Sequence, residues 1–139
     1  MSPRQVRRVE KAVDRAERAC GLQFTVFLGG VETEPRAFAE ELMVELGLLS
    51  RPAVLLLVAP PQRRFEIVTA PHARERITDH ECQIVAASMS ASFAVGDITG
   101  GVCEGLRLLA QYAGPGAAER VEDELPDVLL GTQLPVPPS

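Results

Sequence analysis

Apolar residues recur three or four positions apart through the first twenty residues of the chain: Val6, Val9, Val13, Ala16 and Cys20. This spacing puts them on one face of a helix, with arginine and glutamate on the opposite face. Ser2 and Pro3 are typical of a helix start, because serine caps the first amide groups and proline tolerates the first helical position. Gly21 is typical of a helix end. The pattern predicts an amphipathic helix over residues 3–20.

The next fifty residues contain three runs with strand character. Residues 22–28 are β-branched and aromatic, and residues 53–59 are apolar without alternation, as in a strand covered on both faces. A helix starting at Pro35 is expected between them. Residues 63–69 alternate charged and apolar side chains after a short proline loop, so we expect this third strand to pair antiparallel with the second. The runs predict a βαβ unit followed by an antiparallel hairpin.

The second half of the chain carries two helix-start signals. Thr78, Asp79, His80 and Glu81 match a capping box, in which the Thr78 hydroxyl and the Glu81 carboxylate bond each other's backbone amides. The following helix has its expected apolar side at Ile84, Val85, Ser88, Met89 and Phe93. Asp97 is a good cap for a last helix, whose expected stripe is Ile98, Val102, Leu106, Leu109 and Ala113.

Three glycines, Gly100, Gly101 and Gly105, lie inside that last helix. Each costs about 1 kcal/mol relative to alanine in an exposed helix interior, so their presence requires a reason. One explanation is close packing of the helix against the sheet or another helix. The other is an open helix N-terminus that receives an anion. A second glycine pair, Gly29 and Gly30, follows the first strand, but it lacks the further residues of a phosphate-binding fingerprint and is interpreted as an ordinary turn.

The length of 139 residues is that of one domain. Residues 1–116 are predicted to form a single α/β domain, with a small mixed sheet of about three strands and helices on both faces. Residues 117–139 are predicted to form a short acidic helix and a proline-rich C-terminal tail, because prolines interrupt regular structure there.

Charge is distributed unevenly along the chain. The formal net charge of −5 argues against nucleic acid as a partner. The first helix is rich in cations: Arg4, Arg7, Arg8, Lys11, Arg15 and Arg18. The C-terminal part is rich in acids: Glu119, Glu122, Asp123, Glu124 and Asp127. Both segments are explained as solvated faces; the alternatives are that they attract each other or that either one docks a partner.

The spacing of the cysteines and the hydropathy of the chain predict a cytoplasmic protein. Cys20, Cys82 and Cys103 are far apart in the sequence, lack the spacing of a metal knuckle, and are expected to be reduced. No apolar signal region is visible near the start, and the longest apolar run, residues 53–59, is much shorter than a bilayer span of about 20 residues. We therefore expect a cytoplasmic protein without a membrane segment of its own; its oligomeric state stays open.

Candidate chemistry is sparse. His80 is two residues before Cys82, so on a helix the two side chains point apart and do not form a nucleophile–base pair. Oxygen ligands for calcium or magnesium are the remaining option, and the candidate metal ligands are Asp79, Asp97 and Glu81. Helix capping explains all three carboxylates without a ligand, so no cofactor is required, and the sequence leaves open whether the protein is an enzyme.

The order of these elements resembles the TPM domain family. The resemblance rests on the Thr78–Asp79 helix start, a helix running from there through Met89 to Phe93, the Gly96–Asp97 pair, the glycine-rich last helix, and the strands at residues 22–27, 54–59 and 65–69. It covers residues 3–113 in order and is nearest to a small actinobacterial subgroup of unknown function. It implies an α/β fold with a small sheet and helices on both faces. Family members include a thylakoid acid phosphatase, a photosystem repair protein and membrane-anchored bacterial proteins.

The chain departs from the family pattern at two loops. Ser50, Arg51 and Pro52 replace an Asn-Gly loop before the second strand, and Ala70–Pro71 stands where a glycine often follows the third. Only Asp79 and Asp97 carry over as acidic residues of the family's site.

The first hypothesis for the function is therefore a non-catalytic module that binds another protein. The alternative is a weak metal-assisted acid phosphatase with carboxylates at two helix starts, and a third is an anion sensor at residues 96–101.

Overall fold

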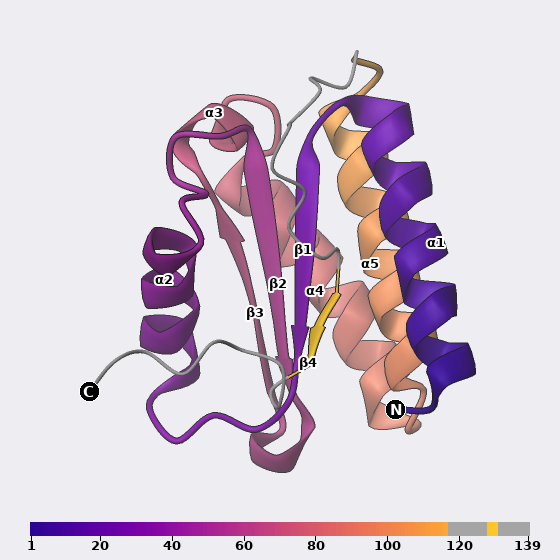
Figure 1. The fold of residues 1–139 in the computed structure, drawn as a ribbon. Helices are drawn as coiled ribbons and strands as arrows, with labels where there is room; N and C mark the ends of the chain where they lie inside the picture. Colours follow the sequence, from indigo (N-terminus) through magenta and orange to yellow (C-terminus); the bar gives the residue numbers. More distant parts are fainter. Residues whose placement is uncertain (117–127, 131–139) are drawn as a thin grey trace.

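The computed structural model describes residues 1–116 and 128–130, which form helices and a sheet in separate layers (Figure 1). The α-helices are α1 (Pro3–Cys20), α2 (Pro35–Glu45), α3 (Pro71–Arg74), α4 (Asp79–Ala94) and α5 (Ile98–Ala113). The strands are β1 (Gln23–Leu28), β2 (Ala53–Ala59), β3 (Arg64–Thr69) and β4 (Val128–Leu130), and a 3-10 turn, η1 (Pro60–Gln62), joins β2 to β3. The mixed α/β architecture predicted from the sequence is confirmed.

The sheet has the strand order β3-β2-β1-β4. β2 pairs in parallel with β1 and antiparallel with β3, as expected for a βαβ unit followed by a hairpin. The fourth strand was not predicted. β4 pairs in parallel with Val26–Leu28 of β1, and its three residues are too few to show a strand pattern. The acidic helix expected near residues 117–125 and the proline-rich residues 131–139 lie outside the described residues.

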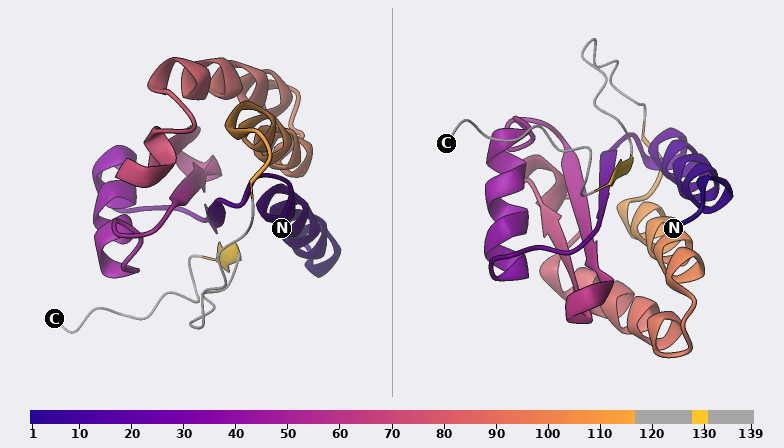
Figure 2. Two further views of the ribbon diagram at one scale, coloured as in Figure 1. Left: turned by 90° about the horizontal axis from the view of Figure 1, so that it is seen from above. Right: turned by 60° about the horizontal axis from the view of Figure 1, so that its bottom comes forward.

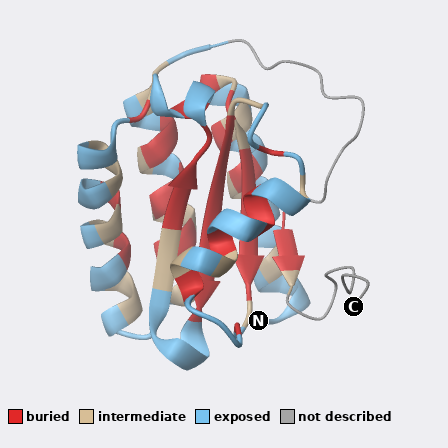
Figure 3. Ribbon diagram, turned by 90° about the vertical axis from the view of Figure 1, so that its left-hand side faces the viewer, coloured by how far each residue is buried: buried red, intermediate tan, exposed pale blue. Residues whose placement is uncertain are grey.

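Two apolar cores cover the two faces of the sheet. α1, α4 and α5 lie on one face and α2 lies on the other (Figure 2). All seven residues of β2 are buried, which confirms that its uninterrupted apolar run belongs to a strand covered on both sides. Burial concentrates on the strands and on the sheet-facing sides of the helices, while the outer helix faces are exposed (Figure 3).

The helix boundaries follow local signals. Ser2 and Gln5 form a capping box at α1, and Thr78 and Glu81 form one at α4. The Asp97 carboxylate accepts a hydrogen bond from the Gly100 amide at 2.9 Å. One detail of the predicted apolar faces is wrong: Ile84 is 42% exposed and faces solvent on the outer side of α4. The packing of α4 against its neighbours decides which of its side chains are buried, and the number of apolar residues on a face does not.

Two of the glycines in α5 bring it close to α4. A Cβ atom on Gly101 would lie 2.5 Å from Cε1 of Phe93, and one on Gly105 would lie 2.6 Å from Sδ of Met89. At such distances alanine at either position would require the Phe93 or Met89 side chain to move, or the two helices to separate. Close helix packing is therefore the reason for Gly101 and Gly105, as the first of the two explanations predicted.

Side chains bond backbone groups of β3, an edge strand, and of the part of β1 that precedes its pairing with β4 at Val26–Leu28. On β3, Arg36 Nη1 donates to the Ile67 carbonyl and Arg74 Nη2 donates to the Thr69 carbonyl, each at 3.0 Å. On β1, the Phe24 amide donates to Glu17 Oε2 at 2.9 Å. These contacts protect strand edges against pairing with other chains. None of the helices within residues 1–116 has the length and hydropathy needed to cross a membrane.

Candidate functional site

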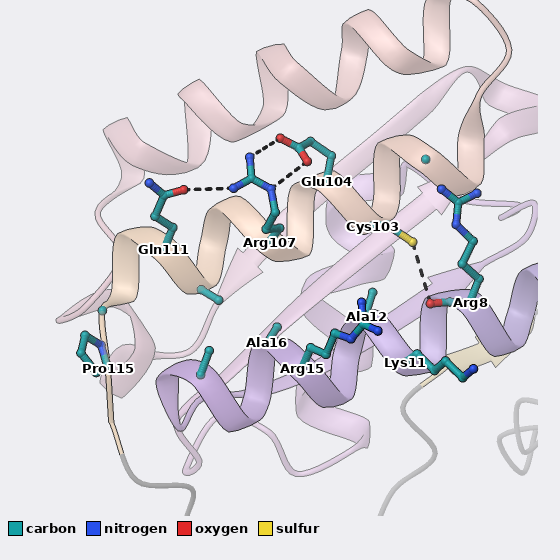
Figure 4. Close-up of a pocket in the computed structure, with 14 residues that line it drawn as sticks. Arg8, Lys11, Ala12, Arg15, Ala16, Cys103, Glu104, Arg107, Gln111 and Pro115 are labelled. Atoms are coloured by element: carbon teal, nitrogen blue, oxygen red, sulfur yellow. Dashed lines mark hydrogen bonds and ion pairs between the residues drawn. The ribbon is translucent and has the colours of Figure 1, made fainter.

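A groove runs between α1 and α5, which pack side by side (Figure 4). We call it the α1–α5 groove, and its volume is about 890 Å³. From α1 it is lined by Arg8, Lys11, Ala12, Arg15, Ala16 and Ala19. From α5 and the residues after it, it is lined by Gly100, Cys103, Glu104, Arg107, Ala110, Gln111, Gly114 and Pro115.

The sequence of α1 places cations along one rim of the groove. Arg8, Lys11 and Arg15 are three and four residues apart, so they share one face of the helix. The buried residues Val9, Val13 and Cys20 of α1 face away from these cations and join the apolar core. Alanines lie between these two faces and form the groove floor from the α1 side: Ala12, Ala16 and Ala19. The charged groups of the three cations therefore lie along the border of a shallow apolar surface that the alanines form.

The α5 rim is held by hydrogen bonds along the helix. Arg107 forms a bidentate ion pair with the Glu104 carboxylate: Nη2 donates to Oε1 at 2.5 Å and Nε donates to Oε2 at 2.9 Å. Arg107 Nη1 also donates to Gln111 Oε1 at 3.3 Å. The hydrogen bond from Arg107 lowers the pKa of the Glu104 carboxyl, so the carboxylate keeps its charge and that charge is offset by its neighbour.

The groove carries a charge opposite to that of the whole chain. Four cations and one carboxylate line it, a formal charge of +3, whereas the chain has −5. Ion pairs between described residues involve Arg18, Arg36, Arg64 and Arg107, and none of these pairs includes Arg8, Lys11 or Arg15. The α1 rim is therefore a row of cations without an ion-pair partner in this part of the chain.

A smaller pocket, of about 360 Å³, lies at the carboxyl ends of β1 and β4. We call it the strand-end pocket, and it is lined by Met1, Gln5, Leu28, Gly29, Gly30, Pro60, Pro61, Gly96, Asp97, Ile98, Thr99 and Leu130. The first turns of α1 and α5 both contribute to it. Ligands of open α/β sheets commonly bind at the carboxyl ends of the strands where the strand order reverses, and β1 with its neighbours on both sides is such a place.

The three predicted metal ligands are divided between two ends of α4. Asp79 and Glu81 lie in the first turn of α4, whereas Asp97 follows its last turn. Sixteen helical residues between these ends extend about 24 Å. One cation at about 2.3–2.6 Å from each ligand cannot reach both Asp79 and Asp97. No group of three or more histidine, cysteine or acidic side chains with metal-binding geometry occurs within residues 1–116 and 128–130.

The cysteines are protonated thiols at neutral pH. Burial, followed by the charges of Asp79 and Glu81, raises the pKa of Cys82 to about 11. Burial also raises the pKa of Cys20 and of Cys103, and Cys103 makes a weak contact of 3.9 Å with the Arg8 carbonyl. Because the thiolate is the nucleophilic form, these cysteines have the character of apolar core residues.

Sequence reasoning did not identify the α1–α5 groove. The signal was present in the three- and four-residue spacing of Arg8, Lys11 and Arg15. That spacing defines a cationic helix face, but it does not show that α5 lies beside this face and forms the second rim.

The comparisons with known proteins give a family of unknown function. The family described as domain of unknown function DUF5130 matches residues 1–110. The uncharacterized protein Rv2468c of Mycobacterium tuberculosis is 30% identical over 110 residues. That match covers 78% of this chain and 64% of the relative, so the chain spans less than two thirds of the relative's length.

Similar folds occur among solved structures. The BA42 protein of the psychrophilic bacterium Bizionia argentinensis has a TM-score of 0.83 at 15% identity, covering 94% of this chain and 95% of that one. An N-terminal domain of a protein from P. gingivalis has a TM-score of 0.68 at 22% identity, covering 81% and 75% of the two chains. The N-terminal domain of the cg2496 protein from Corynebacterium glutamicum has a TM-score of 0.67 at 11% identity, covering 90% and 84%.

These structures share the fold with this chain, and their identities are too low to carry function. The family that matches is named differently from the TPM domain family, so membership of the TPM family stays a prediction. The relatives' names assign neither a substrate nor a partner.

Proposed function

Given that the chain belongs to the DUF5130 family, whose function is unknown, we propose that it is a non-catalytic module that binds another protein in the α1–α5 groove. The observation that carries this proposal is the row of cations on one rim, which has no ion-pair partner within the described residues. Surface cations without partners cost little by themselves. Here the cations are aligned along one rim of an apolar groove. A bound segment would gain affinity from the apolar surface that it buries, and the row of charges would fix its orientation.

The sheet edges support this choice of surface. Arg36 and Arg74 bind carbonyl groups of β3, and Glu17 binds an amide of β1. A partner that added a strand beside β3, or beside the start of β1, would have to displace these side chains. The α1–α5 groove requires no such displacement, since its floor consists of small side chains on two helices whose backbone groups are bonded internally.

Filling the groove with a large side chain provides a direct test. Ala19 is exposed and lines the groove, so Ala19→Trp blocks it without entering the core. Ala87→Trp is the matched control, because Ala87 is also an exposed helical alanine but lies on α4 outside the groove. We expect affinity purification from native-host extract to recover a specific protein with wild type and Ala87→Trp, and at least about tenfold less with Ala19→Trp.

Both variants are compared with wild type by circular dichroism and thermal unfolding, so that a folding defect is recognised. A partner recovered equally with Ala19→Trp would bind elsewhere and would contradict the groove as the docking surface. Recovery of nothing specific with wild type would contradict the binding function itself.

A second candidate function, metal-assisted acid phosphatase activity, is favoured by the position of Asp97 in the strand-end pocket. Its Oδ1 caps α5 through the Gly100 amide, while Oδ2 has no hydrogen bond within the described residues. We propose that Oδ2, backbone carbonyls and water would hold calcium or magnesium, which would polarise phosphate oxygens. Asp79 and Glu81, at the far end of α4, would be a separate weak site.

Cation binding at Asp97 predicts a metal-dependent thermal shift. Calcium or magnesium at about ten times its Kd should stabilise the protein by about 1.4 kcal/mol, or roughly 4 °C. Asp97→Asn should abolish the shift while preserving the helix cap, since asparagine caps as well as aspartate. Asp79→Asn, at the other end of α4, is the control that should leave the shift unchanged.

The same samples are assayed for hydrolysis of p-nitrophenyl phosphate. No shift at millimolar calcium or magnesium would remove this second candidate, and so would a shift that Asp97→Asn leaves intact. Hydrolysis without added cation that survives Asp97→Asn would point to a contaminating phosphatase.

A further inference from the structure

We infer that the segment bound in the α1–α5 groove is an acidic α-helix of the partner protein; this inference rests on the proposed function and specifies the chemistry of the same site. Charge is the first reason. The groove has a formal charge of +3, and three of its cations, Arg8, Lys11 and Arg15, have no ion-pair partner within the described residues. An acidic segment complements them, whereas a basic one is repelled.

Side-chain size is the second reason. Ala12, Ala16 and Ala19 line the groove from α1, and Gly100, Ala110 and Gly114 line it from α5 and the residue after it. Small residues on facing helices let backbones approach to about 8–10 Å, the ordinary distance between packed helices. A third helix can therefore lie in the groove with its own small residues against this floor.

Backbone chemistry is the third reason. The sides of α1 and α5 offer no free amides or carbonyls, because helical backbone groups are bonded internally. An extended segment would bury its own backbone polar groups there without partners, which is unfavourable. A helix satisfies its backbone groups itself and brings only side chains to the groove.

Length and spacing agree with a helical segment. The α1 rim from Arg8 to Ala19 and the α5 rim from Gly100 to Gln111 each extend about 17 Å, or three helical turns. Arg8, Lys11 and Arg15 span about 10.5 Å of the helix axis. Glutamates three and four positions apart on an adjacent helix repeat at the same interval, so each cation can meet one carboxylate.

The experiment uses a synthetic helical probe and the full chain. The probe is a fluorescein-labelled, alanine-rich peptide of about 18 residues with glutamates three and four positions apart, long enough to populate a helix. Three comparison probes are the same peptide with two central prolines, the same peptide with lysine for glutamate, and phosphatidylserine vesicles. Binding is followed by fluorescence anisotropy for peptides and by co-sedimentation for vesicles.

Paired charge reversals locate the binding site. Arg8→Glu with Arg15→Glu changes two cations that line the groove, and Arg4→Glu with Arg7→Glu makes the same change on α1 outside it. We expect the glutamate helix to bind wild type, the first double variant to lose at least about tenfold in affinity, and the second to lose less than about threefold. The proline and lysine probes should bind at least about tenfold more weakly than the glutamate helix.

Several outcomes would overturn the inference. Equal binding of the proline peptide would contradict a helix, and equal binding of the lysine peptide would contradict acidity. Binding to vesicles but not to the peptide would identify an anionic membrane surface as the ligand. Markedly tighter peptide binding after neutralising the acids of residues 119–127 would show that the chain's own segment competes for the groove, and would contradict a partner as the occupant.

Failure of this inference is distinguishable from failure of the proposed function. If a host protein is lost with Ala19→Trp but retained by both charge-reversal variants, the groove is a docking surface whose ligand is not acidic. If no host protein depends on Ala19, the binding function fails regardless of how the peptides behave.

Discussion

Replacing Arg76 with alanine is expected to lower the free energy of unfolding by about 3 kcal/mol. The Arg76 guanidinium donates to the carbonyl groups of Cys20 at 2.6 Å, Ala113 at 3.0 Å and Gly114 at 2.8 Å. Cys20 ends α1 and Ala113 ends α5, so one side chain joins the C-terminal ends of two helices. Arg76→Ala leaves these carbonyls without their donor and places two partially negative helix ends side by side without a compensating charge.

Urea unfolding followed by circular dichroism measures this effect. Arg76→Lys keeps the charge but lacks the planar guanidinium that donates to several carbonyl groups at once, so it should recover only part of the loss. The matched control is Arg107→Ala, which removes another arginine with several hydrogen bonds, but on the exposed side of α5. Because its ion pair with Glu104 is solvent-exposed, that variant should lose at most about 1 kcal/mol.

A loss for Arg76→Ala no larger than that for Arg107→Ala would show that water replaces the guanidinium at both helix ends. Arg76 would then have no special structural role, and the close approach of α1 and α5 at this end would depend on apolar packing alone.

The second large effect is expected at the contact between α4 and α5. Gly101→Val should lower the free energy of unfolding by about 3 kcal/mol, because even a Cβ atom at this position would lie 2.5 Å from Cε1 of Phe93. The Phe93 ring packs edge-on against Phe65, with ring centroids 5.1 Å apart and an angle of 84°. Moving the ring away from α5 would therefore also disturb its contact with Phe65.

Gly105→Ala is the comparison that separates crowding from helix propensity. Its Cβ would lie 2.6 Å from Sδ of Met89, which is a flexible side chain able to change rotamer. Alanine also gains about 1 kcal/mol over glycine in a helix. We expect a net loss below about 1 kcal/mol for Gly105→Ala, measured by the same urea unfolding. Wild-type stability of Gly101→Val would show that α4 and α5 can separate without cost, and would contradict close packing as the reason for Gly101.

Features decided by neighbouring residues were predictable from the sequence. The capping boxes at Ser2 and Thr78 involve atoms three residues apart, so the sequence contains both partners. The unbroken apolar run of β2 predicted burial on both faces, and the alternating residues after it predicted an antiparallel partner. The mixed α/β fold followed from the order of these local signals.

Features decided by distant residues were not predictable in the same way. β4 has three residues and acquires its strand conformation by pairing with β1, about a hundred positions earlier in the chain. The separation of Asp79 and Asp97 is of the other kind, because it follows from the sixteen-residue length of α4, which lies between them in the sequence.

The candidate binding site also combines a feature that the sequence determines with one that only the tertiary structure determines. The sequence by itself determined that α1 has a cationic face, because helical periodicity fixes which side chains point in the same direction. Only the tertiary structure decided that this face borders a groove, because the second rim comes from α5, some ninety residues later in the chain. Periodicity acts within one element, whereas a groove requires two elements whose relative position depends on the packing of the whole core.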